Sequence, residues 1–255
     1  MAVQQIARTA PGLPQPIGLS HAFSGDHAWC REKMMLADEL AGGVAVATFF
    51  EDGGFERAID RYTEVTKGTD RRAVVSMWSL YYFAGISIPY LLARRLAGQV
   101  LPVAFDEMTI ALTEDGLPRA FGLSHRGMIG EETSGDEFSV VGPLMADHLN
   151  MAVERLKRCG LSAKLLWNNA AVYIDYTLRL TDSEGGGRSA PDLPLFVRGC
   201  LPDGGPNPLC GSVRQVEEDG QMIQRRKLCC LRYMLPGVAS CGNRCALPSQ
   251  RNPQQ

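Results

Sequence analysis

The chain has 255 residues, of which 45% are hydrophobic and 21% are charged, and its formal net charge is -2. This composition is typical of a soluble globular protein that is long enough to bury a large core without disulfides or metal ions. The nearly balanced charge does not favour nucleic-acid binding.

Two helices are predicted near the start of the chain. Residues 25–43 have helical spacing, with Asp26 as the predicted N-cap and a pair of glycines at the end. A second helix is predicted over residues 55–68, where Gly68 ends it.

The longest apolar run, residues 73–93, raises the question of a membrane span. It contains three serines, several tyrosines and Pro89, and arginines flank both ends. These features are more typical of a buried core helix, so we predict no transmembrane segment. Asp70 is predicted to cap this helix, Pro89 to break or kink it, and Gly98 to end it.

The N-terminus lacks the pattern of a secretory signal, so we expect a cytoplasmic protein with reduced thiols.

The pattern then changes from helical spacing to alternation. Residues 101–125 alternate around a Glu-Asp-Gly turn, which predicts a β-hairpin. Helical spacing returns over residues 140–160 and 162–182, with Ser162 capping the second helix. A second hairpin is predicted to turn at Asp219-Gly220.

The order of these elements predicts an α+β fold, because strands and helices do not alternate regularly. Residues 183–194 are rich in glycine and proline and are interpreted as a linker. We therefore expect a helix-rich body over residues 1–190 and a small C-terminal segment over residues 191–255.

Four of the eight cysteines lie within that C-terminal segment, at Cys229, Cys230, Cys241 and Cys245. Thiolates select zinc, copper(I) or iron–sulfur clusters. Structural zinc sites usually separate paired ligands by two to four residues, whereas here the first pair is adjacent. Adjacent side chains point to opposite faces of an extended strand, so the backbone must bend for both to reach one site.

Adjacent ligands suit a two-iron cluster, because its two metal atoms offer separate coordination positions. A structural zinc site, buried core cysteines and a disulfide remain alternatives. Cys30 and Cys159 are interpreted as packing residues, and Cys200 and Cys210 as alternative ligands.

The C-terminal sequence resembles that of the FhuF-type ferric-siderophore reductases. That family carries Cys-Cys, ten residues and then Cys-Gly-x-Cys, and here Cys229-Cys230, ten residues and Cys241-Gly242 match in turn. The resemblance covers roughly residues 70–248 and is weaker upstream of the cysteine motif. It includes a Trp-x-Asn at Trp167 and Asn169, which we interpret first as core residues and second as a lining of the substrate face. One departure is the spacer before Cys245, which has three residues in place of two.

The resemblance implies a [2Fe-2S] cluster bound by the four cysteines, with Cys245 as the least secure ligand. It also implies reduction of Fe³⁺ in an imported siderophore, usually of the hydroxamate type. Hydroxamate oxygens hold Fe³⁺ far better than Fe²⁺, so one electron loosens the iron. Because an inner-membrane importer delivers the substrate in that family, peripheral contact with the inner membrane is an open expectation.

The electrons must come from elsewhere, because the sequence has no dinucleotide-binding fingerprint. From Gln221 onward there are six basic side chains and no acidic one. Arg226, Arg232 and Arg244 are the candidates for tuning the cluster or docking a partner. Positive charge favours the reduced cluster and attracts an acidic donor such as a ferredoxin or flavodoxin.

Two other functions remain as alternatives. One is a non-catalytic siderophore-binding or interaction protein with a structural zinc site, which the longer spacer before Cys245 keeps open. The other is an iron–sulfur sensor that releases no iron.

Overall fold

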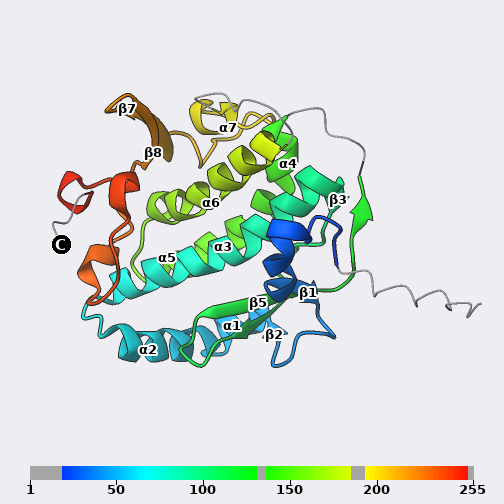
Figure 1. Ribbon diagram of the computed structural model, residues 1–255. Helices are drawn as coiled ribbons and strands as arrows, with labels where there is room; N and C mark the ends of the chain where they lie inside the picture. The colour runs from blue at the N-terminus through cyan, green and yellow to red at the C-terminus, as the bar shows by residue number, and fades with distance from the viewer. Residues whose placement is uncertain (1–18, 131–135, 185–192, 252–255) are drawn as a thin grey trace, which may run out of the picture.

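The computed structural model describes residues 19–130, 136–184 and 193–251 (Figure 1). Its α-helices are α1 (Val46–Glu51), α2 (Gly54–Thr66), α3 (Arg71–Ala97), α4 (Glu137–Leu144), α5 (Asn150–Lys157), α6 (Ala163–Glu184) and α7 (Pro194–Val197). The remaining helical turns are η1 (Gly25–Glu32), η2 (Met145–Leu149), η3 (Arg232–Met234), η4 (Gly242–Arg244) and η5 (Pro248–Gln250). The strands are β1 (Met34–Leu36), β2 (Val44–Ala45), β3 (Gln99–Val100), β4 (Thr109–Leu112), β5 (Pro118–Leu123), β6 (Met128–Ile129), β7 (Val213–Glu218) and β8 (Gln221–Arg226).

The architecture is α+β, as predicted. α3 crosses the middle of the molecule, with α6 on one side and α1 and α2 on the other (Figure 1). A four-stranded sheet has the order β1-β5-β4-β2, in which β1 and β5 are parallel and the other pairs antiparallel. The pairs β3-β6 and β7-β8 form separate two-stranded sheets.

Helix α3 forms the core of the fold, and both of its predicted ends are confirmed. The Asp70 side chain accepts hydrogen bonds from the first turn, and Gly98 adopts a left-handed conformation at the C-cap. α3 is the one helix of the described residues that is long and apolar enough to span a membrane. However, 83% of its most apolar window is buried inside the protein, as in a core helix.

Pro89 was predicted to break or kink this helix. The predicted break does not occur, because α3 continues to Ala97. A proline inside a helix costs one backbone hydrogen bond and about 3 kcal/mol. Here Tyr90, Leu91 and their neighbours are fully buried. Tertiary packing on both sides of the proline therefore outweighs the local penalty.

The prediction of one helix over residues 25–43 was also wrong. The segment forms the 3-10 helix η1, preceded by Ser24 as the N-cap, and then strand β1. β1 pairs with β5, which places Met34 opposite Phe121 in the core. A long-range strand pairing thus replaces the helix that local spacing favoured.

The other predicted elements are present. The first hairpin turns between β4 and β5, and the second turns at Asp219-Gly220, where both residues have positive φ. The helix predicted over residues 140–160 is α4, η2 and α5 in sequence, with η2 as a π-helical turn. Ser162 accepts a hydrogen bond from Leu165 at the start of α6.

The predicted boundary between the body and the C-terminal segment falls on residues 185–192, which lie outside the described ranges. On the described side, Leu235 and Cys230 belong to the same apolar core as α3. The cysteine segment is thus packed onto the helical body.

The π-helical turn places His148 at the centre of this core. Its Nε2 lies 2.7 Å from the Tyr82 hydroxyl, and its Nδ1 lies 3.0 Å from the Val103 carbonyl oxygen. The carbonyl requires a proton on Nδ1, so Nε2 accepts from the tyrosine and the ring is neutral. Burial lowers the pKa of His148 to about 3, although its hydrogen bond to Val103 acts in the opposite direction.

The free energy of unfolding should therefore fall by about 2–3 kcal/mol between pH 7 and pH 4.5 because of this histidine. The unfolded state binds the proton near the ordinary histidine pKa of 6.5, while the native state resists it until about pH 3. Lowering the pH through this window consequently favours unfolding. Denaturant titrations at both pH values should show a smaller loss for His148→Gln, and equal losses for both proteins would contradict this assignment.

Candidate functional site

The four C-terminal cysteines come from two segments that meet beside α3 and β8. Cys229 and Cys230 follow β8, and Cys241 and Cys245 bracket η4. The Sγ atoms of Cys230 and Cys241 lie 3.4 Å apart. Cys230 and Cys245 are buried, while Cys229 and Cys241 are half-buried. In Figure 1 this segment lies at one end of the molecule, next to the start of α3.

The backbone bends directly after the adjacent pair. Leu231 has a φ of 63°, in the left-handed region, and its backbone N–H donates to Cys229 Sγ at 3.3 Å. A non-glycine residue rarely adopts this conformation, so the bend is held by its surroundings. The bend lies after both cysteines and places the Leu231 backbone against the Cys229 thiol.

The longer spacer before Cys245 is accommodated by a 3-10 turn. Gly242 has a φ of 58°, and the Cys245 N–H donates to the Gly242 carbonyl at 2.9 Å. Arg225 ties this turn to β8, because its Nε donates to the Asn243 carbonyl at 3.1 Å. The three residues therefore form a closed turn that keeps Cys245 inside.

The thiols influence one another strongly. Hydrogen bonding to Cys230, together with burial, raises the pKa values of Cys229 and Cys241. The pKa of Cys230 is lowered, first by hydrogen bonds from Cys229 and Cys241 and further by the charge of Arg226. These neighbours thus favour the thiolate form of Cys230, which is the form that binds a metal.

The chemistry of this donor set fits a thiolate-bound metal centre. Four soft sulfur donors lie on two adjoining segments, and buried cations are close to them. Among the described residues, no group of three or more His, Cys, Asp or Glu side chains is already arranged as a metal site. The structure thus brings together Cys230 and Cys241 directly, with the other two thiols on the same loops.

An amide and hydroxyl network fixes the position of the first cysteine pair. The Asn169 Nδ2 donates to the hydroxyls of Ser76 and Ser79 at 3.1 and 2.9 Å, and its Oδ1 accepts from Arg226. The Ser76 hydroxyl in turn donates to the Cys230 carbonyl at 2.9 Å. α3 and α6 thereby hold the cysteine loop through polar groups that are all buried.

The neighbouring Asn168 adds a second link. Its Nδ2 donates to the Ser212 carbonyl at 2.9 Å, and its Oδ1 accepts from the Leu228 N–H at 2.6 Å. The interpretation of Trp167 and Asn169 as core residues agrees with their burial. Sequence reasoning missed Asn168 and the two serines, although two consecutive asparagines within an apolar run are a signal for a buried polar network.

The three arginines singled out from the sequence lie in different surroundings. Arg226 is 4% exposed and donates into the asparagine network, so it can tune the site but has no surface for docking. Burial acts to lower the pKa of Arg232, but nearby Cys241 and Cys230 outweigh it and raise the pKa. The Arg232 Nε is buried and donates to no acceptor. Arg244 is exposed.

The other cysteines lie apart from these contacts. Cys30 is fully buried, and burial raises its pKa to about 12, as for a packing residue. Cys159 is half-buried against the core. Cys200 is exposed, and the Cys210 thiol lies 3.6 Å from the Val197 carbonyl, within the loop region that follows α7.

The described residues form a helix-rich α+β protein in which four thiols lie beside the start of α3 and strand β8. Residues 76–222 match the family model described as "Ferric iron reductase FhuF-like transporter". The chain belongs to this family. The matched region contains Ser76, Asn168 and Asn169 and ends before Cys229.

The chain is also similar to a curated protein of Escherichia coli (strain K12) named "Ferric siderophore reductase". The two are 27% identical over 180 residues, which cover 68% of this chain and 66% of the relative. The chain thus spans just under two thirds of that relative's length.

Proposed function

We propose that this protein reduces Fe³⁺ in a siderophore of the hydroxamate type and so releases iron in the cytoplasm. Cys229, Cys230, Cys241 and Cys245 would hold a [2Fe-2S] cluster. The observation that carries the proposal is the contact between the two cysteine-bearing segments, in a chain of a ferric-reductase family. The family and the relative support the substrate class in its coarser form, a ferric siderophore.

When bound, a [2Fe-2S] cluster supplies a one-electron carrier. The reaction is balanced by one electron from a separate donor, which converts Fe³⁺ in the chelate to Fe²⁺. An acidic ferredoxin or flavodoxin suits this role because Lys227 and Arg244 are exposed cations beside the cysteines. Peripheral contact with the inner membrane belongs to this proposal, since the substrate enters there.

The chain's own residues would favour the added electron. Arg226 and Arg232 place two positive charges next to the thiols, and both side chains are at least partly removed from solvent. Cations near a centre that gains negative charge stabilise its reduced form. The free Nε–H of Arg232 is a donor available to sulfur.

Anaerobically purified protein should contain about two irons and two sulfides per chain, as a [2Fe-2S] site requires. Its visible absorbance should bleach with dithionite and return with a ferric trihydroxamate. One zinc per chain, with neither sulfide nor colour after anaerobic reconstitution, would contradict the proposal and favour the siderophore-binding alternative. A cluster that does not reduce the ferric chelate would favour the sensor.

A further inference from the structure

A groove opens directly beside Cys241. Its walls are α6, the strand β8 and the turn η4, and its volume is about 710 Å³. Cavities that bind small molecules usually have volumes of roughly 300–1,000 Å³. Cys241 itself lines the groove, so a molecule seated there touches one of the four cysteines.

The lining is rich in hydrogen-bond donors. Arg244 and Gln224 contribute nitrogen donors, whereas the Arg179 Nε already donates to Asp175, and among the described lining residues there is no acidic side chain. The amide nitrogen of Gln224 is buried without a hydrogen-bond partner. Met222 and Ile223 add apolar surface from β8. Such a lining fits a ligand with many oxygen acceptors carried on apolar arms.

The charge balance indicates which chelate fits best. Arg179 forms an ion pair with the buried carboxylate of Asp175 at 3.0 Å, which offsets one of the two lining cations. A groove with little net charge suits an uncharged ferric trihydroxamate better than a triply anionic ferric catecholate. A protein donor would need a broad docking face, whereas this site is hollow and has the size of a small molecule.

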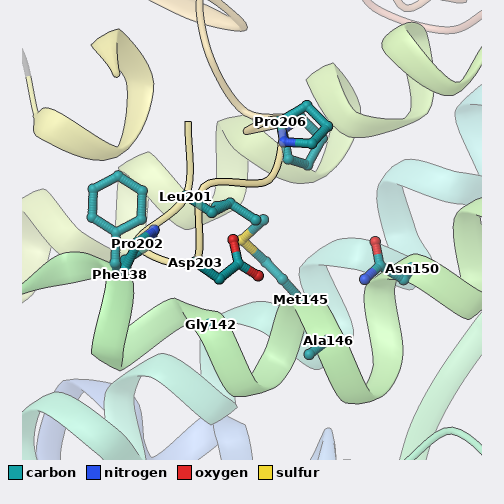
Figure 2. Close-up of a pocket in the computed structure, with 10 residues that line it drawn as sticks. Phe138, Gly142, Met145, Ala146, Asn150, Leu201, Pro202, Asp203 and Pro206 are labelled. Atoms are coloured by element: carbon teal, nitrogen blue, oxygen red, sulfur yellow. The ribbon is translucent and has the colours of Figure 1, made fainter. Parts of the chain in front are cut away.

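A second cavity illustrates the contrast. It has a volume of about 510 Å³ and lies between α4, η2 and the loop that contains Leu201 (Figure 2). Figure 2 shows Phe138, Met145 and Leu201 around it, with Asp203 and Asn150 as polar groups. None of its lining residues is a cysteine, so a ligand there would not touch the candidate redox centre.

We infer that the groove between α6 and β8 is where the ferric trihydroxamate docks, in contact with Cys241. This inference rests on the proposed function for the class of ligand. The short path that it creates lets the electron reach the chelate without passing through the rest of the protein. The docking site thus shares the turn η4 with Cys241 and Cys245.

Binding can be tested without any redox step. The probe is the uncharged gallium(III) complex of a cyclic trihydroxamate of the ferrichrome type, which has the charge of the iron complex but accepts no electron. Calorimetry should show binding to the anaerobically purified full chain. Met222→Trp and Ser183→Trp, which fill the groove from its two walls, should each weaken binding at least tenfold. Both positions are exposed, so the fold should tolerate the change.

Met151→Trp is the matched control, because Met151 is an exposed methionine on α5, away from the groove. It should bind the gallium complex like the unchanged protein. Unchanged binding by both groove variants would overturn the inference, and ferric reduction by the same samples would show that the proposed function survives. Tighter binding of a gallium catecholate in the groove would overturn the assigned ligand class. If the groove variants lost binding of a ferredoxin but still bound the gallium trihydroxamate, the groove would be assigned to the electron donor instead.

Discussion

Cys230→Ser should abolish the visible absorbance of the anaerobically purified protein and reduce ferric-trihydroxamate reduction to the level of a protein-free control. Cys230 is fully buried, its Sγ lies 3.4 Å from that of Cys241, and hydrogen bonds from Cys229 and Cys241 lower its pKa. A serine oxygen is a harder and far less acidic ligand, so it cannot replace this thiolate. Iron content, sulfide content and the spectrum of the variant give the measurement.

The same series decides the fourth ligand. Cys245→Ser should also lose the chromophore, because Cys245 is buried by the turn that Gly242 begins. Cys210→Ser should keep it, since that thiol lies against the Val197 carbonyl. Cys159→Ser is the matched control on the helical body. Retention of colour by Cys245→Ser and its loss in Cys210→Ser would replace Cys245 by Cys210 in the ligand set.

Asn169→Ala should lower the free energy of unfolding by about 3 kcal/mol, because it leaves the buried Arg226 guanidinium without its side-chain acceptor. It also removes the donors to the hydroxyls of Ser76 and Ser79. Denaturant titration measures the loss. Since this network holds the Cys230 carbonyl through Ser76, the variant should also lose its chromophore faster to an iron chelator.

Asn150→Ala provides the matched control, because Asn150 is an exposed asparagine at the start of α5. It should change stability by less than about 0.5 kcal/mol, as is usual for surface positions. A loss of under about 1 kcal/mol in Asn169→Ala, with an unchanged rate of chromophore loss, would show that the asparagine network does not position the cysteine loop.

Several features of the fold could be predicted from the sequence because their causes are local. Asp70 and Gly98 bound α3 through capping geometry that needs only the adjacent backbone. Asp219-Gly220 turns a hairpin because both positions have positive φ, which this pair tolerates. The spacing of the cysteines likewise follows directly from the order of residues, and it already indicated a thiolate site and the need for a bend.

Long-range packing decided the rest. It turned residues 34–36 into a strand beside β5, and it carried α3 through Pro89. It also paired Asn169 with Arg226, 57 positions away, and opened a groove beside Cys241. Local spacing contains no information on which distant groups meet, because burial and hydrogen-bond satisfaction are settled over the whole chain. The sequence by itself therefore determined the donor atoms of the candidate site, whereas the tertiary structure decided how they are held and what can reach them.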